Sequence, residues 1–287
     1  MSISEFPAAD TPTAPQRAPL PGFGRGTVAW RGLTLPAPRL RVARRSVVVS
    51  AGLLALVLFV STWAWLATPA TDGLLIHVRR EAARHHVPYT ALGAVAPVMR
   101  YALVASEDQR FFQHKGIDVI GIARAMVDDA RAGAFVEGGS TLTAQLAKNA
   151  YLGGHDHTIP LKLEDLVLAL KVEQRYDKNT ILEMYLNLTY YGEGAYGIGA
   201  AAERYFGVAP ARLNLAQAAI LASLVQAPGA HDPWCHPHAA RAGQEEVLER
   251  MVRSSYITEA AEAAALADRS AYAGPGGVIP RNTFCGA

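Results

Sequence analysis

Residues 46–67 read SVVVSAGLLALVLFVSTWAWLA, and this uncharged apolar stretch decides how the rest of the chain is organised. It has 22 residues, and a helix needs about 20 apolar residues to cross the hydrocarbon core of a bilayer. Trp63 and Trp65 lie near its end, where aromatic rings favour the membrane interface. A buried core helix would show a polar face, and a cleaved signal peptide has a shorter apolar region. The stretch therefore predicts a transmembrane helix.

The 45 residues before this stretch have the composition of a disordered tail. They contain seven prolines and seven arginines but only two acidic residues, so they have little to bury. Four of the arginines lie close to the apolar stretch: Arg39, Arg41, Arg44 and Arg45. Positive charge is retained on the cytoplasmic side of a membrane. We therefore expect the N-terminus inside, and the residues after the stretch outside, the cytoplasmic (inner) membrane, on its periplasmic face.

The overall composition excludes several classes of protein. The formal net charge of +2 over 287 residues excludes a polybasic nucleic-acid binder, and a hydrophobic fraction of 51% excludes a mostly disordered chain. Two cysteines without a C-x-x-C spacing are too few for a disulfide-built scaffold. In an oxidising space outside the membrane, Cys235 and Cys285 either form one disulfide or remain two free thiols.

The portion after the apolar stretch shows helical rather than strand periodicity. Apolar side chains recur at i, i+3, i+4 and i+7 in Leu163, Leu166, Val167 and Leu170. No sustained period-two alternation occurs, so we predict a mainly α fold. The expected organisation is a cytoplasmic disordered tail (1–45), a transmembrane helix (46–67), a linker and lead-in helix (68–95), one helical domain (96–272) and an irregular C-terminal tail (273–287).

The segment 105–118, ASEDQRFFQHKGID, places charged residues between apolar ones. Burying the charge of Glu107 at a helix end costs free energy unless the carboxylate has a partner or a role. An ionised carboxylate in a cleft is a candidate general base. The alternative is a solvated charged turn, and this segment by itself does not decide between the two.

A second segment, EGGSTLTAQLAKN at 137–149, has the signals of a capped helix. Ser140 or Thr141 after the glycines predicts an N-cap, and the free amides of a helix N-terminus suit an anion such as phosphate. Gln145 and Lys148 are three residues apart, so they share a helix face on which Lys148 could meet that phosphate. An ordinary capped helix without a ligand explains the same pattern.

Two further patterns carry less weight. GEGAYG at 192–197 matches G-x-G-x-x-G, but the preceding stretch is helical in period, so a dinucleotide site is not expected. Histidines crowd with Asp232 and Cys235 between residues 231 and 238 in no standard zinc spacing, and His155-Asp-His157 is a weaker version of the same idea. We predict no metal site from either group.

Together, the motifs resemble those of the peptidoglycan glycosyltransferases of glycosyltransferase family 51, over about residues 96–270. The first, E-D-x-x-F-x-x-H-x-G, matches at Glu107, Asp108, Phe111, His114 and Gly116. The second, G-x-S-T-x-x-Q-Q followed by K-N, matches at Gly138, Ser140, Thr141, Gln145, Lys148 and Asn149. The third, K-x-x-I-L-E-x-Y-L-N, is complete from Lys178 to Asn187. No Ser-x-x-Lys sequence occurs, which indicates the monofunctional branch with a single N-terminal span.

The resemblance implies a lysozyme-like helical glycosyltransferase domain that polymerises lipid II. In the family, a glutamate of the first motif deprotonates the 4-hydroxyl of the acceptor sugar, which displaces a lipid diphosphate with inversion. By resemblance that base is Glu107, and Asp165 is the second active-site carboxylate. The residues expected to bind substrate are Asp108, Arg110, His114, Arg124, Ser140, Thr141, Gln145, Lys148 and Lys162.

The resemblance also implies the partners. These are lipid II, the growing glycan chain and the membrane, with other cell-wall synthesis proteins left open and no nucleic acid. No cofactor is certain, and a divalent cation is left open.

The chain departs from the family pattern at four positions. Ala144 stands where the family has another glutamine, His157 and Leu161 replace arginines, and Asp165 replaces a glutamate. A charge-assisted phosphate contact is worth about 1.5–3 kcal/mol, so two lost arginines weaken a diphosphate pocket. The alternative function is a catalytically weakened, membrane-anchored relative that binds lipid II or a cell-wall partner.

Overall fold

The computed structural model describes residues 40–132, 140–151, 159–279 and 285, with side chains except at 40–45, 127–132 and 159–163. Within these residues the regular structure is helical, and one isolated antiparallel bridge joins Tyr190 to Tyr196. The prediction of a mainly α fold is confirmed. Residues 1–39 of the predicted tail lie outside the described residues.

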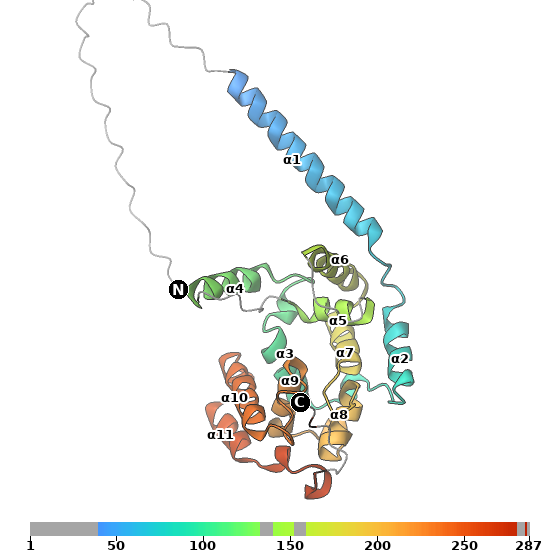
Figure 1. Ribbon diagram of the computed structural model, residues 1–287, viewed down its shortest axis with the longest axis vertical. Coiled ribbons are helices and arrows are strands. Elements are labelled where there is room, and N and C mark those ends of the chain that lie inside the picture. The colour runs from blue at the N-terminus through green and yellow to red at the C-terminus, as the bar shows by residue number, and fades with distance from the viewer. Residues whose placement is uncertain (1–39, 133–139, 152–158, 280–284, 286–287) are drawn as a thin grey trace, which may run out of the picture. The chain divides into compact units, whose positions relative to one another are not determined.

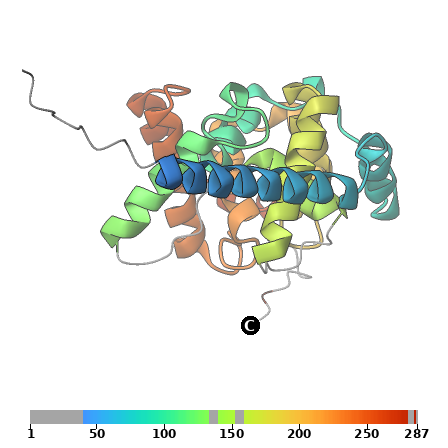
Figure 2. The same cartoon turned by 90° about the horizontal axis from the view of Figure 1, so that it is seen from above.

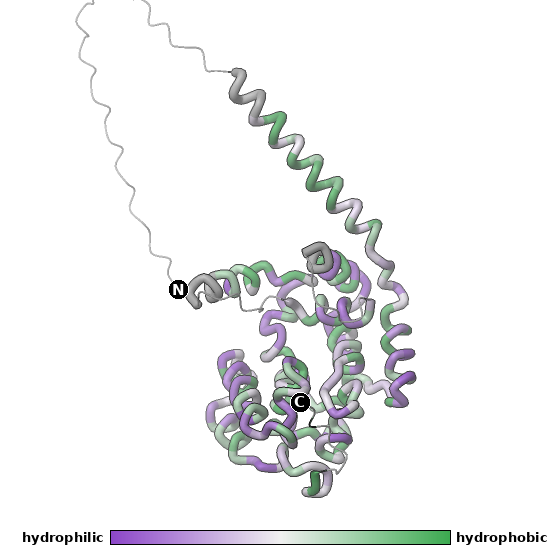
Figure 3. The backbone as a smooth tube through the Cα atoms, in the orientation of Figure 1, coloured by the Kyte–Doolittle hydropathy of each residue, from purple (hydrophilic) through white to green (hydrophobic). Residues whose placement is uncertain are grey.

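Helix α1 (Leu40–Ala67) contains the predicted membrane span. Residues Ser46–Ala67 form 22 helical residues of high mean hydropathy. Figure 3 shows the hydrophobic character continuing along this helix. A helix of this length and composition can cross a bilayer. The chain divides into two units after Leu54, inside α1, and the helices from α2 onward belong to the second unit.

The second unit has a single buried core, lined by several helices. Its α-helices are α2 (Leu74–Arg84), α3 (Pro97–Glu107), α4 (Val119–Ala132), α5 (Leu142–Tyr151), α6 (Ile159–Arg175), α7 (Lys178–Leu188), α8 (Gly197–Phe206), α9 (Leu215–Gln226), α10 (Pro237–Arg253) and α11 (Glu259–Ala267). Short 3-10 turns lie at Leu92–Ala94, Phe111–Gln113, Pro210–Arg212, Ser270–Tyr272 and Pro275–Gly277. One group of packed helices is α3, α9 and α10, and a second is α5, α6 and α7 (Figures 1 and 2).

The first group delivers the end of α3 to the edge of the core. Helix α9 is buried from Ala216 to Leu224, and its many alanines allow α3 and α10 to pack closely against it. A capping box between Asn214 and Gln217 starts α9. Helix α3 is buried from Ala102 to Ser106 and ends one residue later, so its last side chain emerges beside the second group.

The third sequence motif lies on α7 and holds the segment that precedes α3. Glu183 accepts hydrogen bonds from the Tyr89 hydroxyl at 2.9 Å and from the backbone N–H of Leu92 at 2.7 Å. The Asn187 amide bonds both backbone groups of Thr90, at 2.7 and 2.8 Å. These bonds satisfy backbone groups of a connecting segment that lack a helical partner. The motif therefore holds the segment before α3 against α7.

Cys235 and Cys285 form a disulfide with Cα atoms 5.3 Å apart, which answers the question that the sequence left open. The bond joins the loop after α9 to the C-terminal segment. Leu74 and Val78 of α2 belong to the same core as residues of α3 and α9. The predicted domain boundaries stay predictions.

Candidate active site

Glu107 is the last residue of α3, and its half-buried carboxylate meets α5. Carboxylate oxygen Oε2 accepts a hydrogen bond from Nε2 of Gln145 at 2.9 Å. Oxygen Oε1 of the same amide accepts a hydrogen bond from the Tyr185 hydroxyl at 2.6 Å. Because the tyrosine donates to the amide oxygen, the amide N–H group is turned toward Glu107. The carboxylate is therefore held in one orientation at the edge of the core.

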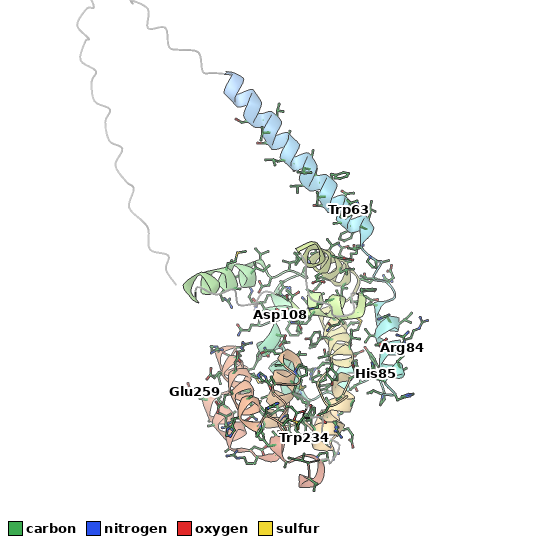
Figure 4. All side chains as sticks on the ribbon, in the orientation of Figure 1. Trp63, Arg84, His85, Asp108, Trp234 and Glu259 are labelled. Atoms are coloured by element: carbon green, nitrogen blue, oxygen red, sulfur yellow. A yellow bond between two sulfur atoms is a disulfide. The ribbon has the colours of Figure 1, made fainter. Side chains whose placement is uncertain are left out.

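Asp108 and His114 form a buried pair next to this carboxylate, in the region where Figure 4 labels Asp108. His114 Nε2 lies 3.0 Å from each oxygen of Asp108, and Asp108 Oδ2 accepts the backbone N–H of Leu142 at 3.0 Å. The first N–H groups of a helix have no partner within it, and a negative charge is favourable there. The pair therefore ties the first motif to the start of α5.

Thr141 is the N-cap of α5, which confirms the predicted cap. Its Oγ1 accepts the backbone N–H of Ala144 at 3.2 Å and donates to the carbonyl of Gly116 at 2.7 Å. Gly116 has a φ of +89°, and a Cβ atom there would lie 3.0 Å from the Ala169 carbonyl oxygen, so glycine is needed at this position. Ser140, before the cap, is exposed.

Two predicted cations, Lys148 and Arg124, lie on α5 and α4. Lys148 lies one turn after Gln145 on α5 and is half-buried, and Arg124 is exposed on α4. Among the residues with described side chains, neither forms an ion pair. Arg110 differs, because its Nε lies 3.3 Å from the Asp118 carboxylate. Lys162 belongs to α6, but its side chain lies outside the described residues.

Asp165 is buried on α6, the helix that packs against α5. Its neighbour Glu164 is half-buried and lies about 100° around the helix. Ala144 is also buried, with an exposed fraction of 6%, so its methyl group packs inside the protein. Of the other two departures from the family pattern, His157 and the side chain of Leu161 lie outside the described residues.

Two tyrosines complete the surroundings of Glu107. Burial raises the pKa of the Tyr185 hydroxyl well above its usual value, and the charge of Glu107 raises it further. The same two causes raise the pKa of Tyr191. Both hydroxyls therefore keep their protons at neutral pH and remain donors. Sequence reasoning did not identify either as a site residue, although Tyr185 stands inside the complete third motif.

The glycine pattern at 192–197 and the group around Asp232 and Cys235 lie together at another place, and His155 and His157 lie outside the described residues. The loop 192–197 joins α7 to α8 and borders a pocket of about 230 Å³. Among the described residues, Glu193, Asp232 and Cys235 have ligand atoms within 4.8 Å of one another. The Cys235 sulfur is in the disulfide, so the group offers no thiolate to a metal. The Glu193 carboxylate forms an ion pair with Arg204 at 2.6 Å.

Comparisons with known proteins agree with the motifs. The family described as Transglycosylase matches residues 73–252. Penicillin-binding protein 1A of Aquifex aeolicus (strain VF5) is 44% identical over 170 residues, which are 59% of this chain and 23% of that protein. Penicillin-binding protein 1A of Neisseria lactamica is 40% identical over 193 residues, 67% of this chain and 24% of that protein.

A crystal structure of Penicillin-Binding Protein 1A from Haemophilus influenzae matches at 37% identity and a TM-score of 0.30, covering 32% of this chain and 14% of that one. The chain spans about a quarter of the length of the curated relatives it matches.

Proposed function

Because the chain belongs to the transglycosylase family, we propose that it is a peptidoglycan glycosyltransferase that polymerises lipid II into glycan strands. The donor is a growing glycan chain on a lipid diphosphate, and the acceptor is lipid II. The observation that carries the proposal is the hydrogen bond of 2.9 Å from Gln145 to the Glu107 carboxylate. It joins an oriented carboxylate to the helix that carries Lys148 one turn further on.

Glu107 acts as the general base. Its carboxylate takes the proton of the acceptor 4-hydroxyl, and the resulting oxygen forms a bond to the anomeric carbon of the donor. The bond from that carbon to the diphosphate breaks at the same time, so the configuration inverts and lipid diphosphate leaves. A general base must lie within hydrogen-bond reach of the proton that it removes, and a fixed side-chain orientation provides this reach. Gln145 and Tyr185 supply that orientation.

The departing diphosphate gains negative charge, and cations placed beside it lower the barrier. Lys148, Arg124 and Lys162 are assigned to this part, with Ser140 and Thr141 as polar contacts at the start of α5. This assignment is supported because neither Lys148 nor Arg124 forms an ion pair with a described side chain, so their charges are available to the diphosphate. Each such contact contributes about 1.5–3 kcal/mol.

The remaining predicted residues receive supporting parts. Asp165 is assigned as the second active-site carboxylate. Asp108 and His114 keep the first motif in register with α5, because their contacts lie inside the protein. Arg110 is assigned to the substrate side, with Asp118 orienting its guanidinium.

The apolar helix supports a location at the membrane. We assign Ser46–Ala67 as a single span of the cytoplasmic membrane, with the N-terminus inside and the catalytic domain on the outer face. The arginines before the span support this orientation. An anchored enzyme meets its lipid-linked substrate at a raised local concentration.

Polymerisation of fluorescent lipid II by the purified full chain tests the proposal. We expect glycan strands from the unaltered protein and a loss of about 10²–10⁴-fold in kcat for Glu107→Gln, which removes the base but keeps the size of the side chain. The substitution Glu249→Gln, at an exposed site on α10, is the matched control and keeps its activity. Absence of product together with retained binding of lipid II would instead support the alternative, a weakened relative that binds lipid II or a cell-wall partner.

A further inference from the structure

Glu107 has a second contact, on the side opposite Gln145. Its other oxygen, Oε1, lies 3.4 Å from the hydroxyl of Ser106, the preceding residue of α3. The same hydroxyl is 3.0 Å from the Nε2 amide of Gln226 at the end of α9. The two carboxylate oxygens are thus approached by two separate hydrogen-bond chains, one from α5 and α7 and one from α9.

The chemistry of the groups sets the direction of the second chain. An amide N–H group can only donate, so the Ser106 oxygen accepts from Gln226. A hydroxyl carries one hydrogen, and that hydrogen then turns to Glu107 Oε1, its acceptor among the described residues. In this orientation the hydroxyl offers the carboxylate a donor rather than a lone pair.

The backbone of Ser106 is fastened separately. Nη1 of Arg250, on α10, donates to the Ser106 carbonyl oxygen at 2.5 Å, and the Arg250 guanidinium also pairs with Glu246 one turn earlier. A cation at the last carbonyls of a helix is favourable. The serine side chain is therefore presented from a fixed backbone, while the Ser106 residue is almost fully buried.

We propose that Ser106 and Gln226 are positioning residues for Glu107, forming a relay in which the Gln226 amide turns the Ser106 hydroxyl toward the carboxylate. The inference rests on the proposed function, because it gives the base of that reaction a second support. Both act through the carboxylate, and neither is assigned a contact with the substrate. At 3.4 Å the final contact is long for a hydroxyl donor, and contacts of this kind tighten when substrate binds. A moderate effect on turnover follows.

The test compares kcat and KM for lipid II polymerisation by the full chain. Ser106→Ala and Gln226→Met each lower kcat about five- to tenfold, with KM within about twofold of the unaltered protein, because the base is misoriented while the substrate contacts remain. The two changes together cost no more than either alone, since the residues act in series. Gln226→Glu has no N–H donor and draws the serine hydrogen away, so it lowers kcat more than Gln226→Met does.

Ser223→Ala is the matched control. Ser223 is a buried serine one turn earlier on α9 whose hydroxyl donates to the Ile220 carbonyl at 2.9 Å, and the substitution leaves kcat unchanged. Gln226 is exposed, so its variants fold even if Ser106→Ala does not. Full kcat in the Gln226 variants, or losses that multiply in the double variant, would overturn the relay.

An inactive unaltered protein would overturn the proposed function alone. The relay is then decided by crystal structures. The Glu107 carboxylate keeps its orientation in the unaltered protein and rotates in Gln226→Met and Gln226→Glu, whereas an unmoved carboxylate in both variants overturns the relay.

Discussion

The Tyr185 hydroxyl donates to Oε1 of Gln145 at 2.6 Å, and this contact holds the amide in the orientation in which its N–H group faces the Glu107 carboxylate. An amide has a donor end and an acceptor end of nearly equal size, so packing alone does not distinguish them. Tyr185 is buried, and its raised pKa keeps the hydroxyl protonated and therefore a donor. A residue of the third motif thus reaches the first motif through the second.

Removing this hydroxyl separates orientation from stability. Tyr185→Phe removes one of the two contacts that hold the Gln145 amide, so the Glu107 carboxylate is held less firmly and we expect kcat to fall about tenfold, or 1.4 kcal/mol. Tyr272→Phe is the matched control, because the Tyr272 hydroxyl also donates to a glutamine oxygen, that of Gln244, at 2.8 Å. Both variants lose about 1 kcal/mol in urea unfolding, but only Tyr185→Phe loses turnover. Equal kcat values for Tyr185→Phe and Tyr272→Phe would contradict the role of Tyr185 in orienting the Gln145 amide.

The second carboxylate is tested by its neighbour. Asp165→Asn removes a buried charge from the face of α6 assigned to the site, and we expect kcat in lipid II polymerisation to fall by at least about tenfold. Glu164→Gln changes the same chemistry about 100° around the helix and leaves kcat near its original value. A fully active Asp165→Asn protein would show that the second carboxylate is misplaced.

The hydrogen bonds from Glu183 to the segment before α3 should contribute to the stability of the fold. Glu183→Ala removes the acceptor of two hydrogen bonds and leaves the backbone N–H of Leu92 without its partner. We expect the free energy of unfolding in urea to fall by about 2–3 kcal/mol. Glu249→Ala, at an exposed ion pair, changes it by less than about 0.5 kcal/mol. An equal loss of unfolding free energy in both variants would argue against a stabilising role for the Glu183 hydrogen bonds.

Asp177, the N-cap of α7, contributes to stability in a way that depends on pH. The backbone N–H of Thr180 bonds the Asp177 side chain and lowers the pKa of that carboxyl below its usual value. The contribution of the ionised Asp177 side chain to stability is therefore complete above the unfolded-state pKa of about 3.9. It is lost as the pH falls through the lower folded-state pKa.

Asp177→Ala should lower stability by about 1 kcal/mol at pH 7, and the difference from the unaltered protein should shrink as the pH falls below about 4. Urea unfolding across this pH range measures it. A difference that is constant with pH would mean that the charge of Asp177 has no part in the cap.

The disulfide closes a loop over a sequence separation of 50 residues, between Cys235 and Cys285. Reduction should lower the free energy of unfolding by about 2–4 kcal/mol, because the unfolded chain regains freedom. Turnover should persist, since neither cysteine takes part in the described hydrogen bonds that link Glu107 to Gln145, Tyr185, Ser106 and Gln226. Thermal unfolding with and without dithiothreitol measures the effect, with the double substitution Cys235→Ser and Cys285→Ser as a control that no longer responds to reductant. An unchanged midpoint in the unaltered protein would contradict a stabilising bond.

Local signals in the chain were enough for the helical class and for some of its elements. The uncharged run at 46–67 could be identified from the sequence because a candidate span is defined by its length and apolar composition. The cap at Thr141 could be predicted because its hydrogen-bond partner is only three residues away. Fixed spacings also made the motifs recognisable, so the family resemblance could be stated, and Glu107 proposed as a base, before any geometry was known.

Only the folded chain shows how these motifs act on one another. The contacts from Gln145 to Glu107 and from Gln226 to Ser106 join residues 38 and 120 positions apart. No periodicity records such pairs, because they depend on how α3, α5 and α9 pack. The pairing of Cys235 with Cys285 was likewise open in the sequence, since the distance between two sulfur atoms is set by the path of the chain between them.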